Sequence, residues 1–321
     1  MLILDAQAVR TLLTPKLAFQ AVEAAFRTLR DPATHQPVRT AVTPPAVPGV
    51  TLLKPAVVDG AYGIKVLSQF PGNADRGLPI LHGFVVLIDS ETGIVEALLD
   101  GGAVTQIRTA AVSALATAEL AREDASRLGL IGAGVQARGH LLALREVRPI
   151  EQVLVWAQHG SEELAAWAAD QDITVRVAPD AEEVVRSSDV VCTVTSSPNP
   201  VLQGAWLTPG THVNAVGAFR PQEREIDAAA VARSTVVVDM LESAAQECGA
   251  VLLAQEEGAI GPGHVVAELT DVLVGRHPGR TSREEVTLFC SMGLAVQDVA
   301  AARHTLEAAR AAGAGVEITF P

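Results

Sequence analysis

Residues 127–137 read RLGLIGAGVQA, and this stretch decides the fold. Its first five residues form a short apolar run that is typical of a buried strand. The spacing GxGxxA follows, in which Gly132 permits a tight turn, Gly134 lets the backbone approach a phosphate, and Ala137 allows a helix to pack on the strand. The N-terminus of that helix would offer N–H groups and partial positive charge to a pyrophosphate. The stretch therefore predicts a dinucleotide-binding strand–loop–helix unit.

The sequence after the glycine loop alternates apolar runs with helical patterns. The first helix extends to about residue 147, and further helices begin at Ser161 and near Asp180. Asp180 and Glu183 have the spacing of a capping box at a helix start. Strands are expected at residues 127–131, 153–156, 173–177, 190–195, 211–216 and 235–239. This alternation predicts an α/β, doubly wound Rossmann domain with a parallel sheet, and we assign it residues 112–290.

The sequence before the glycine loop follows a different pattern. Thr14 and Pro15 predict a helix start, and a long helix is expected over residues 104–122. Between them, β-like runs follow one another without helices, which indicates an antiparallel sheet. These runs cover residues 38–43, 51–58, 62–70, 84–89 and 94–99. A helix at 293–312 and a strand at 316–320 end the chain, and that strand needs a sheet to join. We therefore expect an α+β domain built from both chain ends, residues 1–111 and 291–321.

Composition excludes several classes of partner. The chain has 321 residues, of which 49% are hydrophobic, and a formal net charge of −13. Basic residues are scattered, which argues against nucleic acid or an anionic membrane as the partner. The cysteines Cys192, Cys248 and Cys290 show no metal-ligand spacing, so we expect no metal site and reduced thiols in a cytoplasmic protein. No secretory signal or membrane-spanning stretch is expected.

The choice between NAD and NADP depends on the residues after the second strand of the parallel sheet. An acidic residue there would bind the ribose 2′-hydroxyl of NAD, but residues 157–161 read AQHGS. A 2′-phosphate is therefore not repelled, which favours NADP over NAD, although no arginine is present to bind it. Ligands of such sheets also meet the carboxyl ends of the strands. Candidate cofactor contacts from this reasoning are Gln158, His159, Ser161, Thr195 and Ser196.

Several longer stretches together resemble the ornithine cyclodeaminase/μ-crystallin family over essentially the whole chain. They are residues 77–79 (GLP), 89–93 (DSETG), 105–111 (TQIRTAA), the glycine loop, 268–272 (ELTDV) and 289–298 (FCSMGLAVQD). The resemblance implies a homodimer whose first domain supplies both the dimer interface and the substrate site. It also implies that the substrates are small α-amino or α-imino acids.

The resemblance also assigns roles to individual residues. Arg39, Lys65 and Arg108 match the family's carboxylate-binding cations, and Arg108 lies near both cofactor and substrate. Fixed cations suit a carboxylate ligand, and a lysine inside an apolar β-run such as Lys65 needs a reason to be there. Lys65 and Arg108 are the candidate catalytic residues, and His82 is a further candidate for the substrate cleft. Positions expected near the cofactor or its nicotinamide are Arg108, Thr109, Gly132, Gly134, Val135, Gln136, Val216, Gly217, Ser291 and Met292, the last on the substrate side.

Departures from the family pattern narrow the activity. Ornithine cyclodeaminases carry an acid after the turn that follows residues 213–216, and Phe219 occupies its place here. A phenyl ring can neither accept a proton nor pair with a distal ammonium. The ribose-binding acid is replaced by Ala157, a lysine near the cofactor by Glu223, and a threonine after the GLP turn by Ile80. The turn at residues 217–221, GAFRP, is more similar to the ketimine-reducing members.

The resulting hypothesis is NAD(P)H-dependent reduction of a cyclic ketimine carboxylate, such as Δ1-pyrroline-2-carboxylate or Δ1-piperideine-2-carboxylate, to proline or pipecolate. Ornithine cyclodeaminase, an alanine-type amino-acid dehydrogenase, and a non-catalytic binder of NADPH and a small ligand stay open as alternatives. Asp298, five residues beyond Gly293 on the C-terminal helix, could be part of a structural ion pair. Either Lys65 or a bound water could balance the charge or the protons of the reduction, and the sequence does not choose between them.

Overall fold

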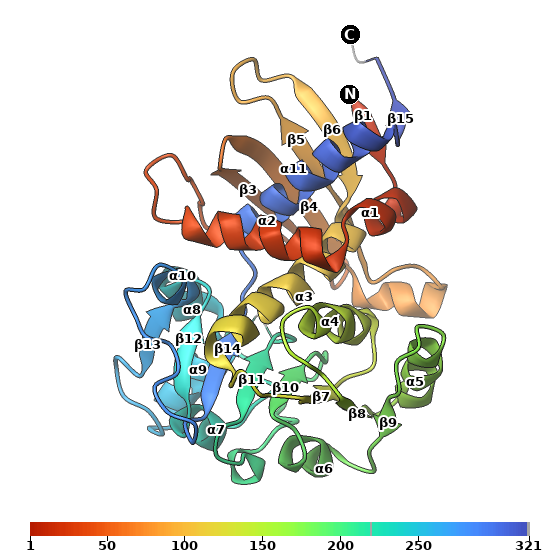
Figure 1. Ribbon diagram of the computed structural model, residues 1–321. Coiled ribbons are helices and arrows are strands. Elements are labelled where there is room, and N and C mark those ends of the chain that lie inside the picture. Colours follow the sequence, from red (N-terminus) through yellow and green to blue (C-terminus); the bar gives the residue numbers. More distant parts are fainter. Residues whose placement is uncertain (219, 320–321) are drawn as a thin grey trace. The chain divides into compact units, whose positions relative to one another are not determined.

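The computed structural model describes residues 1–218 and 220–319, shown in Figure 1. The chain divides into two compact units. Unit 1 consists of Met1–Thr109 with Leu294–Pro321, and unit 2 is Ala110–Gly293. The long helix α3 (Gly101–Leu120) contributes residues to both. Within the described residues, no helix is both long and apolar enough to cross a bilayer.

Unit 2 contains an eight-stranded sheet in which every pairing is parallel. The spatial order is β13-β12-β14-β11-β10-β7-β8-β9. The strands are β7 (Arg127–Ile131), β8 (Gln152–Trp156), β9 (Arg176–Val177), β10 (Val190–Thr193), β11 (His212–Ala215), β12 (Thr235–Val238), β13 (Val265–Glu268) and β14 (Thr287–Cys290). The predicted doubly wound parallel sheet is confirmed.

Helices alternate with these strands, as the sequence predicts. They are α4 (Val135–Arg145), α5 (Ser161–Ala169), α6 (Ala181–Arg186), α7 (Ala228–Ala232), α8 (Leu241–Glu247), α9 (Gly249–Glu256) and α10 (Leu269–Leu273), with a 3-10 turn η2 (Gly204–Trp206). Asp180 caps α6 by accepting a hydrogen bond of 2.8 Å from the backbone N–H of Glu183. The predicted start of α5 at Ser161 is also correct.

The strand order reverses beside β7, where the chain runs outward through β8 and β9 and then returns to place β10 on the other side of β7. Such a reversal is the point at which doubly wound sheets bind ligands, because the loops after the two strands diverge there. The glycine loop follows β7, and residues 194–196 follow β10. The fold therefore brings these two segments to the same end of the sheet.

Two strands of this sheet were not expected from the sequence. β13 and β14 are four residues each, and β14 lies between β11 and β12. A short apolar run has no periodicity that distinguishes a buried strand from a helix, which explains the omission. The predicted strand at residues 173–177 is reduced to the two residues of β9.

Unit 1 contains a seven-stranded mixed sheet in the order β15-β1-β6-β5-β4-β3-β2. Its central strands pair antiparallel, as expected, whereas β1 pairs parallel with β6. The strands are β1 (Leu2–Leu4), β2 (Thr40–Val42), β3 (Val50–Val58), β4 (Ala61–Gln69), β5 (Leu81–Ile88), β6 (Val95–Asp100) and β15 (Val316–Glu317). β15 pairs with β1, so the sheet is built from both chain ends, as predicted.

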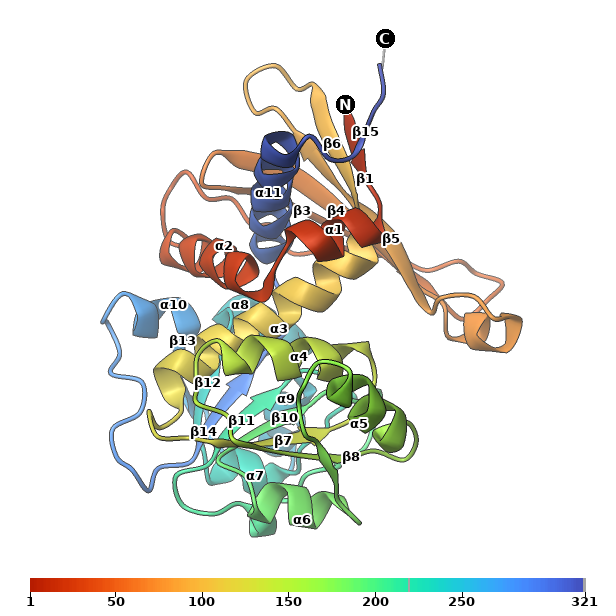
Figure 2. The ribbon, with the colours of Figure 1, turned by 45° about the vertical axis from the view of Figure 1, so that its right-hand side comes forward.

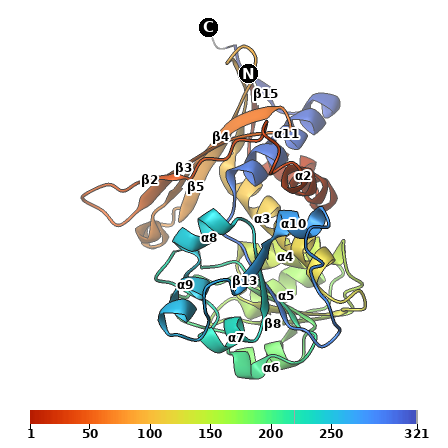
Figure 3. The same cartoon turned by 90° about the vertical axis from the view of Figure 1, so that its left-hand side faces the viewer.

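Helices cover one part of this sheet. α2 (Pro15–Arg27) begins at the Thr14 cap, whose hydroxyl accepts a hydrogen bond of 3.2 Å from the N–H of Leu17. α11 (Ala295–Ala312) packs against β3, β4 and β5 and against α2, and α1 (Ala6–Leu12) lies nearby (Figure 2). The β2–β3 end of the sheet and the 3-10 turn η1 (Pro71–Arg76) project beyond the helices (Figure 3). The side chains of α11 that face the strands therefore meet those of β3 and β4.

Candidate functional site

Three charged side chains from distant parts of the sequence meet inside unit 1. Lys65 of β4, Arg108 of α3 and Asp298 of α11 are 1%, 5% and 0% exposed. The Lys65 Nζ donates to Asp298 Oδ1 at 2.7 Å and to Thr105 Oγ1 at 3.1 Å. The Arg108 Nε donates to the same Asp298 oxygen at 2.7 Å. Folding therefore places both predicted catalytic residues on one buried carboxylate.

A second lysine belongs to the same cluster. Lys54 of β3 lies directly opposite Lys65 of β4 in the antiparallel register, so the two side chains share a face of the sheet. Lys54 is 4% exposed, and its Nζ lies 3.9 Å from Asp298 Oδ2. Arg108 is held from a second point as well, because its Nη1 donates to Gln297 Oε1 at 2.7 Å. We call Lys54, Lys65, Arg108, Gln297 and Asp298 the cation cluster.

Burial and neighbouring charges act on the titration of this cluster in opposite directions. Burial raises the pKa of the Asp298 carboxyl, but Arg108, Lys65 and Lys54 outweigh it and bring that pKa down to about 2. Burial lowers the pKa of the Lys65 ammonium well below its ordinary value, and Arg108 and Lys54 act in the same direction against Asp298. At neutral pH the cluster holds an ionised aspartate and a lysine that releases its proton more readily than usual.

The chemistry available to this arrangement is anion binding and proton transfer. Among the described residues of unit 1, the fully buried charged side chains are three cations and one carboxylate. A carboxylate ligand would offset this excess of positive charge, since buried charges need partners. The bonds to Asp298 and Gln297 occupy Nε and Nη1 of Arg108. A carboxylate ligand would therefore contact mainly Nη2 of Arg108 and would not form a two-point contact with the whole guanidinium group.

The other two substrate-side candidates of unit 1, Arg39 and His82, lie before one strand and on another. Arg39 is half-buried and directly precedes β2. His82 is exposed near the start of β5, where it pairs across the sheet with Ser68. The roles of Arg39 and His82 in substrate binding stay predictions.

The glycine loop of unit 2 has the backbone that a pyrophosphate requires. Gly132 adopts a φ of +113°, and a Cβ built there would lie 2.7 Å from the carbonyl oxygen of Val194, so only glycine fits. A Cβ at Gly134 would point into open space. Gly134 is the N-cap of α4 and provides no side-chain cap. The helix start is thus open on the side from which a phosphate would approach.

Two buried polar atoms near this loop have no hydrogen-bond partner among the described residues. They are Oε1 of Gln136, in the first turn of α4, and Oγ of Ser161, the first residue of α5. Unpaired buried polar atoms are rare in folded proteins and mark places where a ligand or water completes the bonding. Together with the open loop, they fit a bound dinucleotide. Gln158 and His159 are exposed after β8 and are accessible to a ribose.

Glu225 is a buried residue of unit 2 that the sequence reasoning did not identify. Its carboxylate accepts hydrogen bonds from Thr193 Oγ1 at 2.9 Å, from the backbone N–H and hydroxyl of Thr195 at 2.6 and 2.7 Å, and from the backbone N–H of Gly217 at 2.6 Å. Burial raises its pKa although these bonds act the other way. Because they point at Glu225, the polar groups of Thr195 and Gly217 hold the ends of β10 and β11 together. Their assignment as cofactor contacts stays a prediction.

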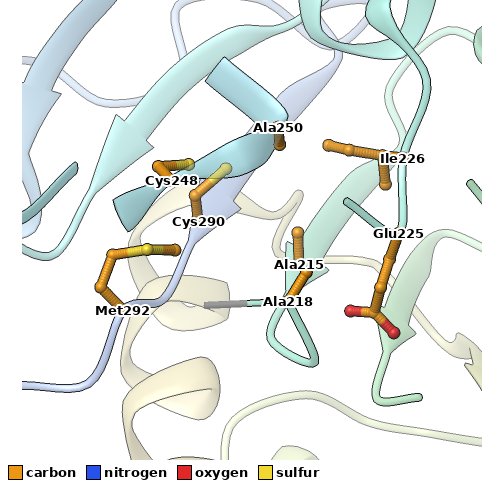
Figure 4. Close-up of a pocket in the computed structure, with 8 residues that line it drawn as sticks. All are labelled: Ala215, Ala218, Glu225, Ile226, Cys248, Ala250, Cys290 and Met292. Atoms are coloured by element: carbon orange, nitrogen blue, oxygen red, sulfur yellow. The ribbon is translucent and has the colours of Figure 1, made fainter. Parts of the chain in front are cut away.

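A small pocket lies beside this residue (Figure 4). Among the described residues that line it, Glu225 is the one charged side chain. The others are apolar or sulfur-containing: Ala215, Ala218, Ile226, Cys248, Ala250, Cys290 and Met292. Met292 is 5% exposed and belongs to the hydrophobic core of unit 2. Ser291 and Val216 are likewise buried, and Ser196 is exposed. The described residues of this pocket include no cation that could bind a substrate carboxylate, so the pocket is a weaker candidate for the substrate site than the cation cluster.

Sequence reasoning missed Lys54 and Gln297 and gave Asp298 only a structural role. Lys54 lies in an apolar β-run, the same signal that singled out Lys65, and could have been found by it. Asp298 does form ion pairs, as that reading expects, but its partners are the two candidate catalytic residues. Phe219, whose identity argues against cyclodeamination, lies outside the described residues. Among those residues, no group of histidine, cysteine and acidic side chains could hold a metal ion.

Known proteins provide matches over nearly the whole chain. The sequence model of the ornithine cyclodeaminase/mu-crystallin family matches residues 1–313. A Δ1-pyrroline-2-carboxylate reductase of Bacillus cereus is 36% identical over 100% of both chains. The structure of the Thermococcus litoralis Δ1-pyrroline-2-carboxylate reductase, in complex with NADH and L-proline, has a TM-score of 0.96 at 36% identity and covers 99% of this chain and 100% of its own. An archaeal alanine dehydrogenase dimer with bound NAD has a TM-score of 0.94 at 36% identity, with 100% and 99% covered.

Proposed function

This chain belongs to the ornithine cyclodeaminase/mu-crystallin family, and from that membership we propose that it is an NAD(P)H-dependent reductase of cyclic ketimine carboxylates. The substrate would be Δ1-pyrroline-2-carboxylate or Δ1-piperideine-2-carboxylate, and the product proline or pipecolate. The observation that carries the proposal is the cation cluster, in which Lys65 and Arg108 meet on the buried Asp298. Two reductases of the five-membered ketimine are among the similar proteins.

Each charged residue has a role in the proposed reaction. Arg108, Lys65 and Arg39 bind the substrate carboxylate and fix the ring, and this positioning supplies much of the catalysis. A reduced nicotinamide, when bound, supplies the hydride that the imine carbon accepts. The nitrogen of the product needs one proton, and Lys65 is suited to give it because burial and its cationic neighbours lower its pKa. Asp298 holds Lys65 and Arg108 in place throughout.

Unit 2 would hold the dinucleotide. Gly132, Gly134, Val135 and Gln136 would surround the pyrophosphate at the start of α4. Gln158, His159 and Ser161 would contact the adenosine ribose, and Arg108, Thr109, Thr195, Ser196, Val216, Gly217 and Ser291 complete the proposed set. The similar structures contain NADH or NAD. NADP is our proposal for this chain because Ala157 stands where an acid would bind the 2′-hydroxyl.

An alanine-type dehydrogenase is the second candidate, and a specific observation favours it. An alanine dehydrogenase of Archaeoglobus fulgidus is 36% identical over 99% of this chain, the same identity as the Bacillus cereus reductase. Ketimine reduction and alanine formation both transfer hydride to a C=N carbon next to a carboxylate, so the cation cluster could bind the substrate carboxylate in either reaction. Cyclodeamination of ornithine is disfavoured by Phe219, and a non-catalytic binder by the buried Lys65.

We also propose that unit 1 is the substrate-binding domain and forms a homodimer with a second copy. Half of the large apolar side chains that the described chain exposes fall between residues 38 and 84: Val38, Val42, Val47, Leu78, Ile80, Leu81 and Phe84. They lie on or next to the projecting β2–β3 end of the sheet, on the segment between η1 and β5, and on β5 itself (Figure 3). Exposed apolar residues gathered in this way are typical of an interface. The similar alanine dehydrogenase is a dimer. Light scattering should give twice the chain mass, and Ile80→Glu should halve it.

The test is oxidation of NADPH and NADH with a substrate panel: pyrroline- and piperideine-2-carboxylate, pyruvate with ammonia, and ornithine with the oxidised cofactor. We expect turnover with a cyclic ketimine and a loss of about 10²–10⁴-fold in Lys65→Met, the range for a proton donor. Lys16→Met, an exposed lysine of α2, is the matched control and should keep full activity. Cyclisation of ornithine without turnover of either ketimine would overturn the proposal.

A further inference from the structure

Two buried polar atoms at the start of α11 have no hydrogen-bond partner among the described residues. They are Nε2 of Gln297 and Oδ2 of Asp298, on side chains that are both 0% exposed. The first is a donor and the second an acceptor. Leaving such a group unpaired in the protein interior is unfavourable, so two on adjacent residues call for an explanation.

The orientation of these atoms is fixed by their other bonds. Arg108 can only donate, so the atom of Gln297 that it contacts at 2.7 Å must be the oxygen, and the NH₂ group is the one left over. At Asp298, Oδ1 accepts from both Lys65 and Arg108. Oδ2 lies 3.9 Å from Lys54 Nζ, which is beyond hydrogen-bond distance. Neither side chain can turn its unpaired atom away without breaking these bonds.

We propose that Gln297 Nε2 and Asp298 Oδ2 form a two-point recognition site for an α-imino or α-amino acid, with the amide donating to the ligand carboxylate and the aspartate accepting from the ligand N–H. This inference rests on the proposed function and adds a requirement to it. The ligand must carry an N–H next to its carboxylate, which means that the imine is recognised in its protonated form.

The same pair of atoms discriminates against 2-keto acids. A keto oxygen has no hydrogen to give, and it would turn its lone pairs toward the ionised Asp298 carboxylate. A site built to bond an N–H rejects an analogue that lacks one, because its own polar atom then stays unpaired. The positive charge of a protonated imine is also offset by Asp298, in surroundings where Lys54, Lys65 and Arg108 would otherwise repel it. Asp298 is thus a specificity-determining residue for the nitrogen.

Two flat, unreactive carboxylates separate this proposal from general anion binding. Pyrrole-2-carboxylate presents a ring N–H beside its carboxylate, and 2-furoate presents a ring oxygen at the same place. Their dissociation constants would be measured by titration calorimetry on the full chain, with and without NADH. We expect pyrrole-2-carboxylate to bind about 10- to 100-fold more tightly, the usual range for a hydrogen bond to a charged group. Equal affinities would overturn the proposal without any variant.

Two isosteric variants assign the atoms. Asp298→Asn should remove the preference for pyrrole-2-carboxylate and leave the binding of 2-furoate within a few-fold. Gln297→Glu keeps an oxygen for Arg108 but places negative charge at the ligand carboxylate, so it should weaken both ligands equally. Glu307→Gln, on the exposed side of the same helix, is the control and should change neither. A preference that survives in Asp298→Asn would assign N–H recognition elsewhere and overturn the proposal.

This outcome can be told apart from failure of the proposed function. If the enzyme reduces no cyclic ketimine but still prefers pyrrole-2-carboxylate, the recognition site stands and the substrate is another N–H-bearing acid. If it reduces ketimines and shows no preference, the function stands and this inference fails. Should Asp298→Asn not fold, the wild-type ratio and Gln297→Glu still decide.

Discussion

The glycine loop of unit 2 and the cation cluster of unit 1, our two proposed binding sites, are built in opposite ways. The loop uses backbone: six consecutive residues, one glycine at positive φ, and an uncapped helix start. The cluster uses side chains from β3, β4, α3 and α11, with Lys65 and Asp298 separated by 233 residues in sequence. The loop therefore depends on a conformation that a Cβ would destroy. The cluster depends on a charge balance that loss of a single group would destroy.

Between pH 6.5 and 4, acid should destabilise unit 2 through two buried histidines, and this is the largest effect that we expect. Burial lowers the pKa of His140 to about 4 and that of His212 to about 3, both from 6.5. The unfolded chain therefore binds protons first, so stability is lost as pH falls from 6.5 toward those values. His140 alone accounts for roughly 3 kcal/mol. All three tryptophans lie in unit 2, so urea unfolding followed by tryptophan fluorescence measures the loss.

Asp298 acts with the same sign, but in a more acidic pH range. The lowered pKa of Asp298 gives stability that is present above 3.8 and is lost only as pH falls through about 2. His140→Gln should flatten the fall in unfolding free energy between pH 6.5 and 4. An unchanged slope in that variant would mean that His140 does not carry the effect.

Removing the carboxylate of the cluster should cost about 3–5 kcal/mol of unfolding free energy, because Lys65 and Arg108 would remain buried without their counter-charge. The variant is Asp298→Ala, and the measurement is denaturant unfolding at pH 7. Glu23→Ala breaks an exposed pair with Arg27 and should cost at most about 0.5 kcal/mol. Equal costs for the two variants would show that the cluster is no more than a surface-like ion pair.

The two glycines of the loop should respond differently to alanine. Gly132→Ala should lose about 1–3 kcal/mol of stability, because its φ and the Val194 carbonyl both exclude a Cβ. Gly134→Ala should keep or slightly raise stability, since its backbone is extended and the space is open. Both should weaken NADH and NADPH binding, measured by fluorescence titration. Loss of stability without loss of affinity in Gly132→Ala would argue against a phosphate at this loop.

The smallest effect concerns the choice of cofactor. Ala157→Asp would place a carboxylate where a ribose 2′-hydroxyl binds, so the ratio of the NADPH and NADH dissociation constants should rise by about tenfold or more. We expect the wild-type chain to bind NADPH at least as well as NADH. A clear wild-type preference for NADH would contradict our assignment of NADP.

The same contrast explains what the sequence could reveal. The glycine loop, the alternating strands and the returning C-terminal strand are local patterns, and the structure follows them closely. Lys65 and Arg108 were identified through motifs of the family. Their meeting on Asp298 was not, because no local pattern links residues so far apart, and register between β3 and β4 placed Lys54 beside Lys65.

Two short strands and the hydrogen bonds to Glu225 also could not be predicted from the sequence. β13 and β14 lack periodicity, and Glu225 appears in a loop whose sequence gives no sign that it bonds Thr195 and Gly217. The two unpaired atoms of Gln297 and Asp298 become visible only when every other bond of the cluster is counted. Sequence therefore predicted the backbone-built part of the protein better than the part built from side chains.

The return of α11 to the first sheet has a consequence for biosynthesis. Arg108 leaves the ribosome 190 residues ahead of Asp298, and Lys65 leaves 233 residues ahead. At translation speeds of about 5–20 residues per second, Asp298 is synthesised roughly 10–50 seconds after the two cations that it pairs with. Unit 2 is synthesised in that interval and can fold first. A nascent or truncated chain thus has the parallel-sheet unit without a completed cation cluster, which forms only after helix α11 has been synthesised.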